Sequence, residues 1–269
     1  MNIHGADFHF QGFKRACDQN PMALDFCQWF CDHGDEHTLS LLGDTFDLYP
    51  HTYVKTLQVY EEIFSRLSTQ DIQFLPGNHD YGITYLNHLF VWEIFGPGEA
   101  IDAQGRKWWR EHGHEHDPVW GKGGVFDVSS PKGLKAAQTF LATAVALETL
   151  FPQLDQRAIQ LAKWMINKTF PQGKRLGWEH YAKVAMEKFN EGYFGYICGH
   201  THEVWDFVFP GGQRMLNPGS WVEERCYFVD LDEDQIYRFT GPDVITPTQE
   251  FRKTLTFEDT QRLEEMVTV

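Results

Sequence analysis

The sequence predicts an α/β fold, as one domain interrupted by a helical insertion. Apolar runs with strand character alternate with segments of helical periodicity over the first 80 residues. Each of those runs ends in a cluster of Asp, Asn and His residues, and residues 118–190 differ from the rest in charge and apolar content. With 269 residues, the chain is long enough to build a full core.

The first half of the chain has the pattern of strand–helix–strand units. Strands are predicted at 2–8, 38–44 and 71–80, and helices at 21–34 and 52–67. The first helix has a clear start signal, because Asn20 suits the N-cap and Pro21 the first helical position.

The polar clusters recur at the spacing of these units. Asp7 and Asp44 are 37 positions apart, and Asp44 and Asn78 are 34 apart, about one unit each. Because ligands bind at the carboxyl ends of parallel strands, we expect the clusters to converge.

The second half of the chain contains a segment whose composition differs from that of the residues on either side. A further strand and loop are predicted at 106–117, and strands resume from residue 193. Helices are predicted between them, at 133–151, 155–168 and 176–190. Residues 118–190 hold ten Lys and Arg against five Asp and Glu, a net charge of +5, while the rest of the chain carries −20. We therefore expect a core formed by 1–117 and 191–240, a basic and apolar insertion or lid at 118–190, and a tail or edge element at 241–269.

Composition argues against several classes of protein. The net charge of −15 argues against a broad nucleic-acid groove, so no nucleic-acid partner is expected. No run of eighteen apolar residues and no export signal is visible, which favours a cytoplasmic protein without a transmembrane segment. The five cysteines are scattered and odd in number, as expected of buried thiols rather than disulfides.

The polar clusters together offer carboxylate, amide and imidazole ligands. The candidates are Asp7, His9, Asp44, Asn78, His112, His200 and His202. Such oxygen and nitrogen donors suit manganese, iron or zinc rather than a thiolate-bound structural zinc. Seven ligands exceed the needs of one catalytic ion, but two ions that share a carboxylate would use them all. A pair of ions about 3.5–4 Å apart is an arrangement used for displacement at phosphorus, so the set favours phosphoryl transfer.

Five short motifs occur in a fixed order: "DFH", "GDTFD", "GNHD", "HGH" and "GHTH". Together they resemble the signature of the calcineurin-like metallophosphoesterases, over about residues 3–223. The resemblance implies a two-sheet β-sandwich flanked by helices, and hydrolysis of a phosphoester by a metal-bridging hydroxide.

The resemblance also assigns the ligands to two divalent ions that share Asp44. One ion would be held by Asp7, His9 and His202. The other would be held by Asn78, His112 and His200. The leading prediction for the metal is manganese, with iron, zinc and cobalt as alternatives.

Further residues receive supporting roles by the same resemblance. His79 would contact the phosphate and assist the leaving group, and Asp80 would orient His79. Asp47 would be a structural or second-layer residue. His114 and His116 are close enough to compete with His112 for the ligand position, and are otherwise expected to line the phosphate pocket or to be solvated.

The substrate class follows from the details of the motifs. The chain has "GDTFDLYP" and "GNHD", unlike the protein phosphatases of the superfamily, which carry a "GDxVDRG" motif and "GNHE". "GDTFDL" and the insertion of about eighty residues between the fourth and fifth motifs look like the UDP-2,3-diacylglucosamine hydrolases, although those commonly show "GNRD" and "HGD".

A lipid-linked UDP-sugar is therefore the specific substrate prediction, with a soluble nucleotide or another phosphoester as the alternative. The remote alternative is a non-catalytic binding scaffold. Peripheral contact of the apolar insertion with the inner membrane face and the oligomeric state both remain open.

Overall fold

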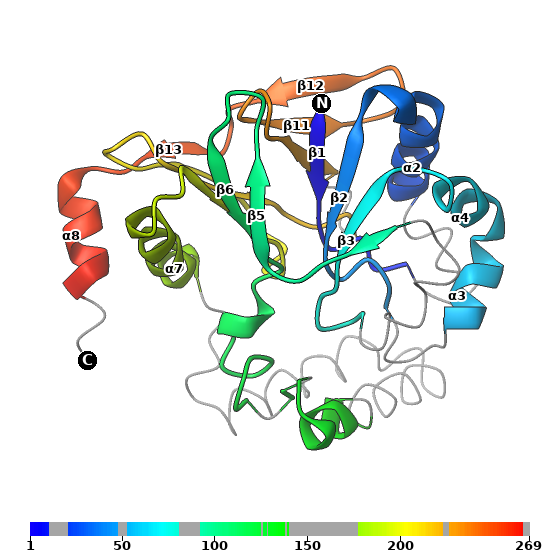
Figure 1. Ribbon diagram of the computed structural model, residues 1–269, viewed down its shortest axis with the longest axis horizontal. Coiled ribbons are helices and arrows are strands. Elements are labelled where there is room, and N and C mark those ends of the chain that lie inside the picture. Colours follow the sequence, from blue (N-terminus) through cyan, green and yellow to red (C-terminus); the bar gives the residue numbers. More distant parts are fainter. Residues whose placement is uncertain are drawn as a thin grey trace, which may run out of the picture.

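The computed structural model describes residues 1–10, 21–47, 53–80, 92–124, 126–127, 129–137, 139, 177–222 and 226–265. Two mixed β-sheets lie against each other and are flanked by helices (Figure 1). This confirms the α/β class and the two-sheet architecture.

The first sheet has seven strands, and its central strands come from the N-terminal half. Its order is β12 (Ile245–Thr248), β11 (Gln235–Phe239), β10 (Tyr227–Asp230), β1 (Asn2–Gly5), β2 (Thr38–Leu42), β3 (Ile72–Leu75) and β4 (Glu93–Ile94). β1 to β4 run parallel, and β10 pairs antiparallel with β1. The strands that were predicted to begin at residues 2, 38 and 71 are thus neighbours, and their carboxyl ends lie at the same edge of the sheet.

The second sheet has six strands. Its order is β13 (Arg252–Thr254), β8 (Val204–Val208), β9 (Arg214–Pro218), β7 (Gly195–Ile197), β6 (Lys107–Arg110) and β5 (Gly98–Ile101). β6 and β7 are parallel neighbours, which brings the loops after residues 110 and 197 together. β12 and β13 form the edges of the two sheets, so the segment after residue 241 contributes edge strands.

Helices cover the two outer faces. Figure 1 shows α2 (Pro21–His33), α3 (Tyr53–Val59) and α4 (Glu61–Leu67) on one side, and α7 (Trp178–Asn190) and α8 (Phe257–Glu265) on the other. α2 and α7 fall where helices were predicted. The helix predicted at 52–67 is instead divided at Tyr60, whose backbone (φ −113°, ψ 27°) leaves the helical region while its ring packs on Phe10.

The insertion is described only in part. Residues 131–137 are helical, where the helix predicted at 133–151 begins. The rest of that helix and the one predicted at 155–168 lie outside the described residues. Among the helices that are described, none is long and apolar enough to cross a membrane. Of the described cysteines, Cys27, Cys198 and Cys226 are buried, Cys31 is half-buried, and none of the four forms a disulfide, while Cys17 lies outside the described part.

Each interface between layers has its own apolar core. Aromatic residues of α2 and α4 pack on the first sheet, Trp108, Ile197 and Val229 belong to a second cluster built from both sheets, and Tyr181 of α7 belongs to a third with residues of the second sheet. Phe26 is central to the first cluster, with ring centroids 4.5 Å from Trp221 and 5.5 Å from Phe228.

We expect Phe26→Ala to lower the free energy of unfolding by about 3–5 kcal/mol, because it leaves a cavity among rings that cannot fully close around it. Phe257→Ala is the matched control, since Phe257 is 78% exposed on α8 and should cost less than about 0.5 kcal/mol. Urea denaturation of the two variants measures both values. Equal losses would show that the aromatic cluster does not anchor the fold.

Candidate metal centre

The predicted ligands lie on loops that leave the carboxyl ends of five strands. Asp7 and His9 follow β1, Asp44 follows β2, and Asn78 follows β3. His112 follows β6 in the second sheet, and His200 and His202 follow β7. Both sheets therefore contribute to one edge of the sandwich, at the lower side of Figure 1.

The backbone at these positions is unusual. Six described residues other than glycine have positive φ, and five of them are Asp7, His9, Asp44, His200 and His202, with φ between 50° and 69°. This left-handed conformation is disfavoured for residues with a Cβ, at about 1–3 kcal/mol each, and persists only where the surroundings hold it. Such strain is typical of functional sites. Here it falls on five of the seven predicted ligands.

Hydrogen bonds between loops hold this backbone. The amides of Asp7 and His9 donate to the carbonyls of Gly43 and Asp44, at 3.0 and 2.8 Å. The turn at 217–221, "NPGSW", joins the same network, because Ser220 and Trp221 both donate to the Asp7 carbonyl.

Glycines in the motifs allow the side chains to approach the backbone. A Cβ at Gly77 would lie 2.2 Å from Asp44 Oδ1, and one at Gly43 would lie 2.4 Å from His112 Nδ1. Neither contact leaves room for another residue type.

Asp7, His9 and His202 form the first group of donor atoms. His9 Nε2 lies 3.2 Å from His202 Nε2, and Asp7 Oδ1 lies 3.8 and 3.4 Å from these two nitrogens. The three could hold one metal ion. Asp7 is fully buried, and its Oδ1 accepts no hydrogen bond in the described part of the chain. Two ring nitrogens and one carboxylate oxygen thus face one another, as the ligands of a single ion would.

Asp44, His112 and His200 form the second group that could hold a metal ion. Asn78 adjoins it, because His112 Nε2 lies 3.2 Å from both Asp44 Oδ2 and Asn78 Oδ1. His112 Nδ1 donates to the carbonyl of Leu42 at 2.8 Å, which leaves Nε2 as the acceptor nitrogen of the neutral ring.

Asp44 connects the two groups. Its Oδ2 is 3.2 Å from His112 Nε2 and 4.0 Å from His9 Nε2. A third possible ion-binding group, His9, Asp44 and His79, overlaps both. The structure therefore brings all seven predicted ligands together, with the side chain expected to bridge at the centre.

The buried carboxylates of this cluster favour positively charged groups close to them. Burial opposes ionisation of Asp44, but the imidazoles of His112, His79 and His9 hold the pKa of its carboxyl well below the usual value. Burial alone would lower the pKa of His112, but the carboxylates of Asp44 and Asp7 raise it to about 10. Since metal ions displace protons from such ligands, divalent cations would supply the same compensation. The donor set fits the predicted metal ions.

Asp117 is a functional residue that the sequence interpretation missed. Its Oδ2 lies 3.2 Å from His200 Nε2, while the buried Nδ1 of His200 has no hydrogen-bond partner among the described residues. A carboxylate on one ring nitrogen commonly orients the other nitrogen toward a metal. Position 117 carried no separate signal, because it simply ends the run "EHGHEHD".

His79 lies beside the metal ligands. Its Nε2 is 4.0 Å from Asp44 Oδ2, and its Nδ1 is 3.0 Å from Asp47 Oδ1. Burial would lower the pKa of His79, but the carboxylates of Asp44 and Asp47 raise it to about 9. Asp47 therefore makes an orienting contact with the His79 ring. Asp80, for which that role was predicted, accepts the amides of Thr45, Phe46 and Gly77, and so ties together the loops that carry Asp44 and Asn78.

His114 and His116 occupy different surroundings. The ring of His114 lies 5.3 Å from that of His112, and burial together with the neighbouring His112 lowers its pKa well below the usual value. His116 Nε2 lies 2.6 Å from Glu111 Oε1. Neither residue is among the described ones that line the cavity at the metal centre, so the structure does not bring them to its wall.

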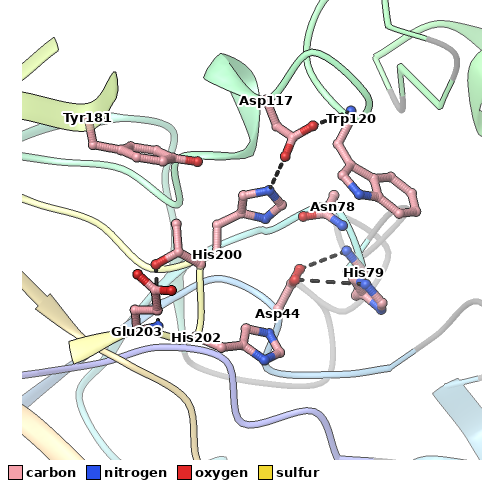
Figure 2. A pocket seen from close by; sticks show the side chains of 10 residues that line it. Asp44, Asn78, His79, Asp117, Trp120, Tyr181, His200, His202 and Glu203 are labelled. Carbon is pink, nitrogen blue, oxygen red and sulfur yellow. Dashed lines mark hydrogen bonds and ion pairs between the residues drawn. The ribbon is translucent and has the colours of Figure 1, made fainter. Parts of the chain in front are cut away.

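A cavity of about 200 Å³ opens over the centre (Figure 2). The described residues that line this cavity are Asp44, Asn78, His79, Asp117, Trp120, Tyr181, His200, Thr201, His202 and Glu203. A substrate in this cavity would contact His79 and the ligand atoms from the same side.

Comparisons with known proteins give weak similarities. No protein-family model matches the sequence, and no curated protein matches it. Among solved structures, a dimetal phosphatase from Danio rerio overlaps with a TM-score of 0.46 at 13% identity, over 91% of this chain and 98% of that one. A predicted phosphoesterase from Streptococcus pneumoniae overlaps with a TM-score of 0.35 at 14% identity, over 92% and 97%.

Vps29 from Entamoeba histolytica, complexed with Zn²⁺, overlaps with a TM-score of 0.38 at 14% identity, over 91% of this chain and 96% of that one. Overlaps at this level do not bear on the activity of the chain.

Asp44→Asn tests the shared ligand. Asn is tolerated at positive φ, so the backbone should stay in place while the central negative charge is lost. We expect the bound Mn²⁺, measured by mass spectrometry of the desalted protein, to fall from two ions per chain to one or none. Two retained ions would contradict a bridging role for Asp44.

Asp117→Asn tests the support of His200. The amide keeps the shape of the side chain but removes the charge that the His200 ring nitrogen contacts, so we expect one metal affinity to weaken by about 10–100-fold. Calorimetric titration of the metal-free protein measures this affinity. Unchanged affinities for both ions, with the same circular dichroism spectrum, would show that His200 does not depend on Asp117.

Proposed function

We propose that the chain is a phosphoester hydrolase that holds two divalent metal ions across Asp44. The observation that supports this proposal most is the convergence of two donor groups on one carboxylate, at the base of a single cavity. Two divalent ions bound there would supply a nucleophile at neutral pH and neutralise negative charge on a phosphoryl group.

The side chains around the centre have separate tasks in this proposal. Asp7, Asp44 and Asn78 provide oxygen donors, and Asp44 and Asn78 line the cavity. The backbone of Asp7 and Asp44 is held by the loop contacts described above before substrate arrives. Preorganised ligands need no rearrangement during the reaction. The unfavourable free energy of fixing their conformation therefore belongs to folding and does not add to the activation barrier.

His79 is the proposed proton donor to the leaving oxygen. Asp47 accepts from Nδ1, so Nε2 is left to face the cavity and Asp44. A general acid must present its proton to the leaving oxygen, and the contact of Asp47 with Nδ1 orients the ring for this.

The specific substrate that we propose is UDP-2,3-diacylglucosamine, cleaved to UMP and a lipid phosphate. Support comes from "GDTFDL" and from the basic, apolar insertion, which could hold acyl chains and a diphosphate together. A soluble nucleotide or another phosphoester is the alternative, because "GNHD" and "HGH" differ from the motifs common in those hydrolases. A scaffold without activity would bind no divalent metal and hydrolyse no activated diester.

Phosphorus NMR of the Mn²⁺-loaded protein distinguishes the candidate substrates from one another and from the scaffold alternative. UDP-2,3-diacylglucosamine, an unacylated UDP-sugar and bis(p-nitrophenyl) phosphate are incubated in parallel. Cleavage of the acylated compound with the unacylated one spared supports the lipid-linked substrate, and cleavage of both supports a soluble nucleotide. If none of the three is cleaved by protein with two bound ions, the proposed function is wrong.

His79→Ala tests the proton donor. The variant should lower kcat by about 10²–10⁴-fold for an alkyl leaving group, which needs a proton, and by much less for p-nitrophenolate, which does not. His33→Ala, on the exposed end of α2, is the control and should leave both rates unchanged. Equal losses for both leaving groups would mean that His79 binds phosphate but does not donate a proton.

A further inference from the structure

Trp120 lies in the cavity next to the proposed proton donor. Its ring centroid is 6.0 Å from that of His79, and both side chains line the same space. Figure 2 shows the indole beside His79 and Asn78. A group that departs next to His79 would therefore meet the indole.

Asp117 connects the backbone next to the indole with the candidate metal centre. Asp117 Oδ1 accepts the amides of Val119 and Trp120 at 2.7 and 3.2 Å, while its Oδ2 contacts the proposed ligand His200. One carboxylate thus ties Trp120 and a metal ligand to the same point. The backbone of Trp120 is therefore held at a fixed place relative to His200.

The segment that carries Trp120 is tightly folded. Gly121 donates to the Asp117 carbonyl at 2.7 Å, and Phe126 donates to the Val119 carbonyl at 2.9 Å. A Cβ at Gly121 would lie 2.4 Å from the Glu115 carbonyl oxygen, so the turn excludes other residues there. Behind the indole, the Phe126 ring packs at 5.1 Å. Hydrogen bonds therefore hold the backbone around Trp120, and the Phe126 ring packs against its indole.

We propose that Trp120 is a specificity-determining residue, which selects phosphoesters whose leaving alcohol carries an aromatic ring near the leaving oxygen. This inference rests on the proposed function, and among the proposed substrates it favours the soluble alternative, because cleavage of UDP-2,3-diacylglucosamine to UMP and a lipid phosphate releases no aromatic alcohol. An indole offers a flat, polarisable face that prefers another aromatic ring over a saturated one of the same size. Nucleosides and aryl or arylmethyl alcohols belong to the favoured class.

A pair of matched diesters tests this selection. Benzyl methyl phosphate and cyclohexylmethyl methyl phosphate have leaving groups of similar size and acidity, but only the first has an aromatic ring. We expect kcat/KM of the Mn²⁺-loaded protein to be about 3–10-fold higher for the benzyl ester, as for one aromatic contact. Trp120→Leu should bring this ratio close to 1, and Trp120→Phe should keep it above 1.

Two controls accompany the test. Trp178→Leu removes an indole that packs on Phe207 and is not among the described residues of the cavity wall, so it should leave the ratio unchanged. Bis(p-nitrophenyl) phosphate reports whether each variant remains an active hydrolase.

The outcomes distinguish the two proposals. If the activated diester is cleaved but the benzyl preference is absent, or persists in Trp120→Leu, the inference about Trp120 is wrong while the proposed function stands. If no ester is cleaved by protein with two bound ions, the proposed function fails and the inference fails with it.

Discussion

The structure depends on one buried carboxylate that faces several imidazoles. Asp44 is 2% exposed, and its Oδ2 lies within 4.0 Å of nitrogen atoms of His9, His79 and His112. A charge in such surroundings is stable only with compensating positive charge close by. The need for that compensation explains why histidines gather on every loop around Asp44, and why divalent cations are the natural occupants of the centre.

The fold meets this constraint with two sheets rather than one. Parallel strands β1, β2 and β3 bring three ligand loops to one edge, and β6 and β7 bring two more from the opposite sheet. The aromatic core reaches the same loops, because Phe8 stacks on Trp221 at 4.9 Å between the two ligands Asp7 and His9. Packing and hydrogen bonds together hold backbone conformations that the isolated loops would not adopt.

Much of the candidate site could be predicted from sequence, because its candidate ligands stand in short motifs directly after strands. Asp7, Asn78 and His200 needed only the strand periodicity and the rule that ligands gather at strand ends. Asp117 and the position of Trp120 could not be predicted, because both depend on the path of the chain after β6. The contact between Asp47 and His79 also required coordinates. The two residues are 32 positions apart in sequence, and the loops after β2 and β3 bring them together.

The same distinction applies to the fold. The start of α2 followed from the signal of Asn20 and Pro21, and both α2 and α7 fall where helices were predicted. The break at Tyr60 could not be predicted, because the ring of Tyr60 packs on Phe10, a contact that local sequence does not encode. The antiparallel insertion of β10 beside β1 is likewise a long-range pairing.

The most direct test of the central claim is electron paramagnetic resonance of the protein loaded with two equivalents of Mn²⁺. Two ions that share Asp44 lie about 3.5–4 Å apart, so the account predicts the spectrum of a magnetically coupled pair. A spectrum of isolated Mn²⁺ ions at full occupancy would show that Asp44 does not bridge two metals, and would contradict the account.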